Sequence, residues 1–238
     1  MRFSSSRLSR SIEINESFVS SIVIENGAVF RGLVEDIVNE IEYGGEELIL
    51  SKDGEAIPFA KSVELIKEFV PFTLNKKRLQ GLLMKRVEKY ALTGENFDTT
   101  QNLLAEIRRF LSSLLLEIPH SVATAGLSVS SLLKAADMTF EEEDASLIDL
   151  IIDYFRLIRE FLGERIFILV NLRSYLTDDE MSSFLKVAVS EKFLLVLIDS
   201  SARQLLPDER RLIVGADLCE INQMEDEIPP HSQLRKMV

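Results

Sequence analysis

The sequence predicts an α/β protein whose mostly parallel sheet is interrupted by a purely helical middle region. Two apolar runs, Ile166–Asn171 and Phe193–Ile198, each contain at least five consecutive apolar residues, as strands buried on both faces of a parallel sheet do. Helical patterns over Ser146–Leu162 and Thr177–Glu191 alternate with these runs. Strand–helix–strand repetition favours a parallel sheet with right-handed crossovers. Between about residues 75 and 136 the periodicity is helical only.

The first third of the chain predicts a mixture of strand and helix. β-Branched residues indicate strands, apolar residues at helical spacing indicate a helix that ends before Gly44-Gly45, and Asp53-Gly54 is typical of a hairpin turn. The expected elements are a strand over Phe18–Ile24, a helix over Ala28–Ile41, a hairpin made of Glu47–Ser51 and Ala56–Phe59, and a strand over Val63–Phe69, for which a helix is the alternative.

The middle region predicts three helices. The first begins at Asn75 and has an apolar face that includes Leu79, Leu82 and Val87, with basic residues on the opposite face. The second covers Asp98–Ile118, and the third covers Leu127–Ala136.

The second of these helices has an unusually broad apolar stripe. Leu104, Ile107, Leu111, Leu114 and Ile118 follow steps of three and four residues, as in a coiled-coil seam. We expect this stripe to pack on a partner helix, either within the chain or across a subunit boundary.

The last third of the chain contains the two apolar runs and their helices. We expect a third strand there at Asp217–Ile221.

Composition predicts a globular, intracellular protein. The 238 residues are 46% hydrophobic and 28% charged, which is far from the composition of disordered chains. Cys219 is the only cysteine, which excludes a disulfide framework and a Cys-rich zinc site. Met1–Ser11 lacks the apolar core of a signal peptide, and the apolar runs are shorter than the roughly 20 residues that span a bilayer. We expect a cytoplasmic protein with no membrane partner.

Charge is distributed unevenly along the chain. The formal net charge is −12, which argues against a nucleic-acid coat protein. Residues 61–110, however, hold ten basic and six acidic side chains, whereas the other 188 residues hold 17 basic and 33 acidic ones. This asymmetry hints at one surface that attracts anions.

A parallel sheet calls for a search for nucleotide-binding loops, and the sequence contains none. No glycine precedes a Lys-Ser/Thr pair in a G-x-x-x-x-G-K-[ST] pattern, and no G-x-G-x-x-G is present. Asn171 and Asp199 follow the two buried strands, where ligands bind in open α/β sheets. We interpret them as ordinary polar residues at strand ends.

The acidic clusters are interpreted as features of helix starts. Thr177 and Glu180 have the spacing of a capping box. The run Glu141–Asp144 precedes the helix at Ser146, where solvated acidic residues favour a helix start. His120 and His231 are too few and too far apart for a metal or catalytic pair, and no Ser/His/Asp or Cys/His constellation is present. The site chemistry therefore indicates a binding protein that is not an enzyme.

The strongest sign of a partner is the basic face of the first middle helix. Few aromatic residues interleave with its basic ones and Trp is absent, so stacking on single strands is not indicated. An ordinary solvated face is the simplest explanation, and a duplex backbone held by charge is the alternative. The face consists of Lys76, Lys77, Arg78, Lys85, Arg86 and Lys89.

The order of these elements resembles the small DNA-end-binding protein family of type II-A CRISPR spacer acquisition. The resemblance runs from about Ile12 to Ile221, roughly nine-tenths of the sequence, and it rests on the order and spacing of several segments. These are Ile22-Val23-Ile24-Glu25 with Val29-Phe30, Phe72-x-x-Asn75 with Leu79 and Leu82, Leu132-Leu133-Lys134, Phe167–Asn171, Tyr175–Glu180 and Leu194–Ile198.

The resemblance implies an assembly and a function. Members of the family form homotetrameric rings in which each subunit has a head similar to P-loop NTPases, without the Walker A loop, and an inserted, extended helical leg. Linear double-stranded DNA threads the ring and is held by lysines without sequence reading or cleavage. For this chain the resemblance implies a head made of residues 1–70 and 138–238 and a leg made of residues 71–137. It also implies contacts with other acquisition proteins, namely the integrase subunits and the effector nuclease.

The resemblance places some of the DNA contacts. Lys134 matches a family lysine, Arg31 lies one residue from another, and Lys52 lies in the hairpin where the family has several. In this hairpin Asp53, Gly54, Glu55 and Ala56 replace most of the positive charge. We expect the DNA contacts to come from these three residues, from Lys61 and from the basic helix face.

Calcium is the metal ion that the resemblance implies, and this sequence departs from the family in the stretch that binds it. The family binds it through an acidic stretch before the short helix, which here is Glu117–Gly126 with Glu117 as its only acidic residue. Glu117, Glu141 and Glu142 are the remaining candidate ligands, and we expect no cofactor.

Two alternatives remain open. The first is an interaction scaffold of the acquisition complex with little DNA affinity. The second is a degenerate NTPase or a metal-dependent nuclease built around Asp178, Asp179 and Asp199.

Overall fold

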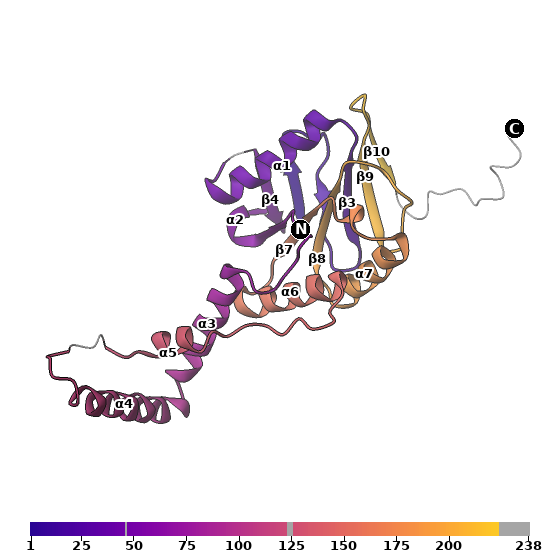
Figure 1. The fold of residues 1–238 in the computed structure, drawn as a ribbon. Coiled ribbons are helices and arrows are strands. Elements are labelled where there is room, and N and C mark those ends of the chain that lie inside the picture. The colour runs from indigo at the N-terminus through magenta and orange to yellow at the C-terminus, as the bar shows by residue number, and fades with distance from the viewer. Residues whose placement is uncertain (46, 123–125, 224–238) are drawn as a thin grey trace, which may run out of the picture. The chain divides into compact units, whose positions relative to one another are not determined.

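The computed structural model of the chain describes residues 1–45, 47–122 and 126–223 (Figure 1). These residues divide into two compact units. The first unit contains Met1–Phe72 together with the chain from Ser146 on, and the second unit is Thr73–Ala145. The second unit is an insertion between two parts of the first.

A six-stranded sheet forms the centre of the first unit. Its strands are parallel to their neighbours except at one edge, where β10 runs antiparallel to β9, so the prediction of a mostly parallel sheet is confirmed. In spatial order the strands are β10 (Glu220–Gln223), β9 (Glu209–Val214), β3 (Val19–Ile24), β8 (Leu194–Asp199), β7 (Ile166–Val170) and β6 (Val63–Ile66).

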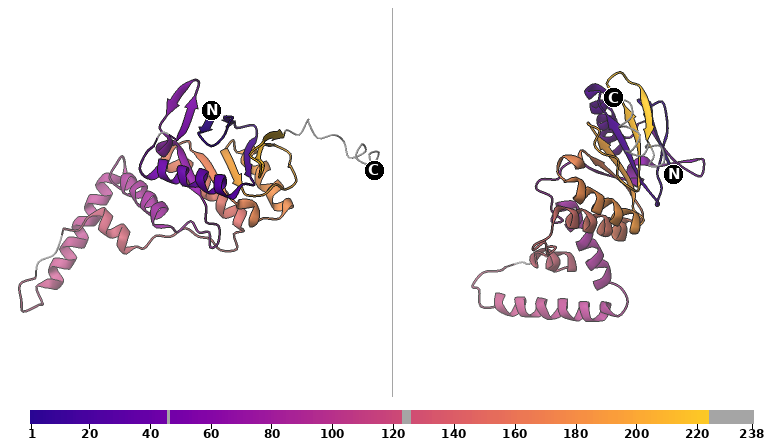
Figure 2. Two further views of the ribbon diagram at one scale, coloured as in Figure 1. Left: turned by 90° about the horizontal axis from the view of Figure 1, so that it is seen from above. Right: turned by 90° about the vertical axis from the view of Figure 1, so that its right-hand side faces the viewer.

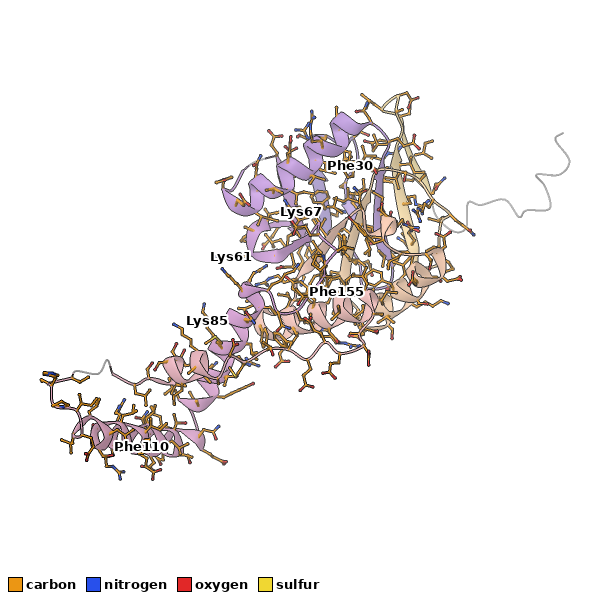
Figure 3. The ribbon with its side chains drawn as sticks, in the orientation of Figure 1. Phe30, Lys61, Lys67, Lys85, Phe110 and Phe155 are labelled. Atoms are coloured by element: carbon orange, nitrogen blue, oxygen red, sulfur yellow. The ribbon has the colours of Figure 1, made fainter. Side chains whose placement is uncertain are left out.

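Two helices, α6 (Leu147–Leu162) and α7 (Asp178–Ser190), cover one face of this sheet. The ring of Phe155 from α6 stacks on that of Phe167 from β7, with centroids 3.9 Å apart, and both rings are buried. Phe184 from α7 meets the Phe155 ring edge-on. These aromatic side chains form the core beneath the two helices (Phe155 is labelled in Figure 3).

The opposite face of the sheet packs against α1 (Gly27–Glu42) and a second, antiparallel sheet. Leu33 and Ile37 of α1 are fully buried in this core, and Asn26 caps the helix by accepting from the backbone N–H groups of Ala28 and Val29. The second sheet has the order β2 (Ile12–Glu13), β1 (Arg2–Ser5), β4 (Leu48–Lys52) and β5 (Glu55–Ile57), followed by the single-turn helix α2 (Phe59–Ser62).

The described part of the second unit consists of three helices and their connections (Figure 2). They are α3 (Lys77–Ala91), α4 (Asn96–Leu115) and α5 (Val129–Ala135), and α3 packs against both of the others. One apolar residue from each helix is buried, namely Leu79, Leu104 and Val129.

The end of the sheet differs from the prediction. The third parallel strand is β9, where no strand was expected, and the segment expected as a strand at Asp217–Ile221 is largely a turn before β10. β9 begins with Glu209, Arg210 and Arg211. Because half of its residues are charged, it lacks the apolar run that is typical of a buried strand. The predicted hairpin forms, but its second strand ends at Ile57, and Phe59 begins α2 instead.

Candidate nucleic-acid interface

The packed pair of helices α3 and α5 carries most of the positive charge of the second unit. Over Lys76–Ala91 and α5 there are seven basic residues and one acidic residue, Glu88. We call these seven residues the basic surface: Lys76, Lys77, Arg78, Lys85, Arg86, Lys89 and Lys134.

Helical geometry aligns part of this surface along α3. At 100° per residue, Arg78, Lys85 and Lys89 fall within an arc of about 40°. At 1.5 Å of rise per residue, they span about 16 Å of the helix axis. Leu79 and Leu83 lie outside this arc, and Leu79 is buried, so packing of α3 turns the three cations outward. This length corresponds to about five base pairs of duplex at 3.4 Å each.

Most of the cations in the basic surface are available to bind a ligand. Lys77, Lys85, Lys89 and Lys134 are exposed, and within residues 1–45, 47–122 and 126–223 their side chains have no hydrogen bond or ion pair. Arg86 is different, because its Nε donates to the Tyr90 hydroxyl at 2.9 Å and its guanidinium lies 5.2 Å from the centroid of the Tyr90 ring.

The first turn of α3 carries positive charges at the end of the helix where the helix dipole favours negative ones. Lys76 is the N-cap residue and has no side-chain capping bond, and the first turn contains Lys77 and Arg78 but no acidic residue. Cations at this end oppose the helix dipole by about 0.3–1 kcal/mol each. Violations of a local rule of this kind concentrate at functional sites.

The remaining cationic candidates lie in the first unit. Arg31 is exposed on α1, and its Nε is 3.8 Å from Glu35 Oε1. Lys52 lies opposite Glu55 in the register of the β4–β5 hairpin and is followed by Asp53. Lys61 is exposed in the last turn of α2 (labelled in Figure 3). Nearby acidic side chains therefore offset the charge of Arg31 and Lys52.

The acidic candidates do not form a metal site in the described parts of the chain, where no group of three His, Cys, Asp or Glu side chains is suitably placed. Glu117 and Glu141 are exposed. The interpretation of Glu141–Asp144 as a solvated run is wrong for Glu142, whose half-buried carboxylate accepts hydrogen bonds from Thr73 and Leu74. Within the proposed calcium stretch, residues 123–125 lie outside the described residues, as does His231.

Asn171 and Asp199 have structural roles at the strand ends. Asn171 adopts a left-handed conformation after β7, and its Oδ1 accepts from the Ser200 N–H at 3.1 Å. Asp199 is 3% exposed, with Oδ2 3.6 Å from Arg173 Nε. Burial is the main reason that the pKa of Asp199 rises from 3.8 to about 6, although Arg173 acts in the opposite direction.

The sequence reasoning missed the buried charges around Asp199. Arg173 donates to Glu209 at 2.6 Å, and Arg211 donates to the same carboxylate at 2.9 Å. All of these side chains are buried, and Arg211 also donates to the backbone carbonyl groups of Arg203 and Gln204. The two arginines therefore fix the loop between β8 and β9. Their sequence separation leaves no local pattern that would reveal them.

The acidic start of α7 is a capping box, as predicted. Thr177 Oγ1 accepts from the Glu180 N–H, and the Glu180 carboxylate accepts from the Thr177 N–H at 2.8 Å. These bonds hold the pKa of Glu180 below its usual value. Asp178 and Asp179 are exposed in the same turn, whereas Asp199 is buried. The three aspartates do not form a metal cluster among the described residues.

Helix α4 exposes the apolar stripe that the sequence predicts. Leu104 is buried, but Leu114 is 49% exposed, and Phe110 (labelled in Figure 3), which with Leu103 widens the stripe, is 61% exposed. Leu103 and Ile118 are also exposed. The described part of the chain therefore leaves most of this stripe uncovered.

The comparison with protein families decides the relationship of the chain. The family model described as CRISPR-associated protein (Cas_Csn2) matches residues 42–218, about three-quarters of the sequence. The chain belongs to the Csn2 family. This assignment confirms the resemblance to type II-A spacer-acquisition proteins and gives the chain a CRISPR-associated role.

The Csn2 match covers all of the second unit, including α3, α4 and α5, and much of the first. Arg31 lies outside the matched residues. No curated protein matches the chain. In the described residues, no helix has both the length and the apolar character needed to span a membrane.

Proposed function

We propose that this Csn2-family protein binds linear double-stranded DNA in the cytoplasm, without reading its sequence, as a homotetrameric ring that assists CRISPR spacer acquisition. The observation that carries this proposal is the basic surface, with seven basic residues and one acidic residue on two packed helices of a chain whose net charge is −12.

The chemistry of the basic surface fits phosphate rather than bases. Lys85, Lys89 and Lys134 are exposed ammonium groups without ion pairs among the described residues. Lysine binds phosphate as a point charge, and such contacts position a protein on DNA without carrying sequence information. Binding should therefore depend on salt, with a slope of about −0.9 in log K against log salt for each phosphate contact.

A ring resolves the conflict between the acidic chain and a polyanionic ligand. A single protomer with a net charge of −12 repels DNA over the Debye length of about 10 Å at 0.1 M salt. Four basic surfaces around one channel would concentrate positive charge, while the acidic groups face away from the channel.

The apolar stripe of α4 is the surface that we assign to subunit contact within this ring. Leu103, Phe110, Leu114 and Ile118 are each about half exposed. Burying the exposed half of such a side chain contributes about 1 kcal/mol, so a few of them on each copy contribute appreciably to association.

Charge reversal tests DNA binding directly. We expect Lys85→Glu with Lys89→Glu to weaken binding to a short linear duplex at least tenfold at 50 mM salt, and to make the salt slope shallower by about 2, because two phosphate contacts are lost. Lys186→Glu on α7 is the matched control, since Lys186 is also exposed on a helix but lies in the first unit. Equal effects of the two changes would contradict the proposal.

Assembly is tested by mass. Light scattering of the wild-type protein should give four times the protomer mass of 27.0 kDa. Phe110→Ser with Leu114→Ser should lower that mass, because both side chains are exposed in the protomer and are not needed for its core. A monomeric wild-type protein would remove the means of concentrating positive charge.

The exposed stripe of α4 also supports a second candidate, a scaffold that docks the integrase subunits or the effector nuclease. The variants described above distinguish DNA binding from a scaffold function. The scaffold requires that the α4 double variant loses these partners in a pull-down and that the charge-reversed variant binds DNA as the wild type does.

We propose that the protein is not an enzyme and needs no metal. Purified protein should neither cleave duplex DNA nor hydrolyse ATP in magnesium, and its DNA affinity should be the same in EDTA and in calcium. Turnover that Asp199→Asn abolishes would instead favour a nuclease.

A further inference from the structure

Side chains join the two segments where the second unit begins and ends. Asn75 lies just before α3, and Phe140 lies after α5. The Asn75 Oδ1 accepts from the Phe140 N–H at 2.7 Å, and its Nδ2 donates to the Phe140 carbonyl at 3.0 Å. One amide side chain thus pairs with a backbone residue through both of its polar groups, as a neighbouring strand would do.

A carboxylate makes the second part of this junction. Glu142 accepts from the Thr73 hydroxyl at 2.8 Å and from the Leu74 N–H at 2.5 Å. The Thr73 Oγ1 also accepts from the Asn75 N–H at 3.0 Å, which ties the two parts together. We call this set of hydrogen bonds the clasp, and its residues are Thr73, Leu74, Asn75, Phe140 and Glu142. All of these bonds are partly buried, and hydrogen bonds to a charged group are stronger than those between neutral groups.

The clasp supplies what the start of α3 lacks. Lys76 is an N-cap residue without a side-chain capping bond, and the first turn has two cations that oppose the helix dipole. A capping residue normally accepts a hydrogen bond from a free N–H group of the first turn and thereby defines where a helix begins. In α3 the residues just before the N-cap take this role. Leu74 is held by burial, and Asn75 is held by its hydrogen bonds to Phe140.

The clasp also lies at the end of the segment that follows α5. Phe140 is five residues beyond Ala135, the last residue of α5. Lys134 on α5 and the cations of α3 are therefore connected through the same junction.

We propose that the clasp positions the basic surface for DNA by fixing the residue at which α3 begins. A slip of α3 by one residue would turn Arg78, Lys85 and Lys89 by about 100°. Because Leu79 must stay buried, such a slip would break either the core of the unit or the alignment of the cations. Thr73, Asn75 and Glu142 are positioning residues, and this inference rests on the proposed DNA binding.

The test uses the full chain and compares Glu142→Ala with Glu142→Gln. Glutamine keeps an oxygen that accepts from Thr73 and Leu74, whereas alanine does not, and both remove the charge. We expect Glu142→Ala and Asn75→Ala to weaken binding to a linear duplex at least fivefold and to make the salt slope shallower by about 0.9 for each displaced contact. Glu142→Gln should bind nearly as the wild type does.

A merely structural role predicts a different pattern. Binding would then fall in proportion to the unfolded fraction seen by circular dichroism, and the salt slope of the folded protein would not change. That result, or wild-type affinity in folded Glu142→Ala and Asn75→Ala, would overturn the inference. Thr73→Val is the milder variant if the alanine variants do not fold, since it removes only the hydroxyl bonds of the clasp.

Amide hydrogen exchange without DNA separates this inference from the proposed function. We expect exchange at residues 80–83, the first N–H groups of α3 with a partner in the helix, to be at least tenfold faster in Asn75→Ala than in the wild type. Thr93→Ala is the matched control, because it removes one side-chain bond to the Lys89 carbonyl at the other end of α3. Unchanged exchange at the start of α3 overturns the inference even if DNA binds, and a wild-type protein that does not bind DNA overturns only the proposed function.

Discussion

Replacing Asp199 by asparagine should stabilise the protein at neutral pH. Asp199 is almost fully buried, its Oδ2 has no hydrogen-bond partner, and the nearest guanidinium nitrogen is 3.6 Å away. Burial therefore outweighs the attraction of Arg173 and raises the pKa from 3.8 to about 6. Each pKa unit corresponds to about 1.4 kcal/mol, so the ionised carboxylate lowers the free energy of unfolding by about 3 kcal/mol.

The sign of the pH dependence follows from this raised pKa. Between about pH 4 and pH 6 the folded protein holds a proton on Asp199 that the unfolded chain has released, so the contribution of Asp199 to stability increases as the pH falls. The asparagine side chain of the variant cannot ionise. The Asp199→Asn variant should therefore exceed the wild type by up to about 3 kcal/mol at pH 8 and equal it near pH 4.

Urea denaturation of both proteins at pH 4, 6 and 8 measures this difference, in which the other titrating groups cancel. Glu209→Gln is the control, because Glu209 accepts from Arg173, Arg211 and the Leu206 N–H. Removing that charge leaves two buried guanidinium groups poorly paired and should cost about 3–5 kcal/mol. An Asp199→Asn variant that is less stable than the wild type at pH 8 would refute the reasoning.

The remaining predictions concern the folding of the first unit. Thr177→Ala removes the capping box of α7 and should lower the free energy of unfolding by about 1 kcal/mol in urea denaturation; Thr177→Ser, which keeps the capping hydroxyl, should stay within about 0.5 kcal/mol of the wild type. Phe155→Ala opens a cavity among Phe167, Phe184 and Phe193 and should cost about 3–5 kcal/mol; a loss below about 1 kcal/mol would show that this cluster is not the core of the unit.

Local sequence patterns predict two kinds of element: strands that are buried on both faces, and helices whose first turn is capped by nearby side chains. β7 and β8 are buried on both faces, so their sequences are continuous apolar runs, and the capping box marks the start of α7. β9 escapes prediction because Glu209 and Arg211 are charged yet buried, and only the distant Arg173 explains why. The two-residue strand β2 is too short to show any alternation.

The candidate site also has one part that the sequence predicts and one part that it does not. Helical periodicity places Arg78, Lys85 and Lys89 on one exposed face of α3, so this part of the basic surface can be predicted from the sequence. The clasp cannot be predicted in this way, because Asn75 meets Phe140 and Glu142 meets Leu74 only when the second unit folds. In the sequence Glu142 looks like one member of a solvated acidic run, and its hydrogen bonds to Thr73 and Leu74 show otherwise.

The most direct test compares the binding of the protein to one duplex in two forms at 50 mM salt. Linear DNA and covalently closed circular DNA of the same sequence offer the same phosphates, but only the linear form has ends over which a closed ring can pass. We predict a gel shift with the linear form and none with the circular form. Equal binding of both forms, or binding of neither, would contradict a cationic ring that encloses DNA.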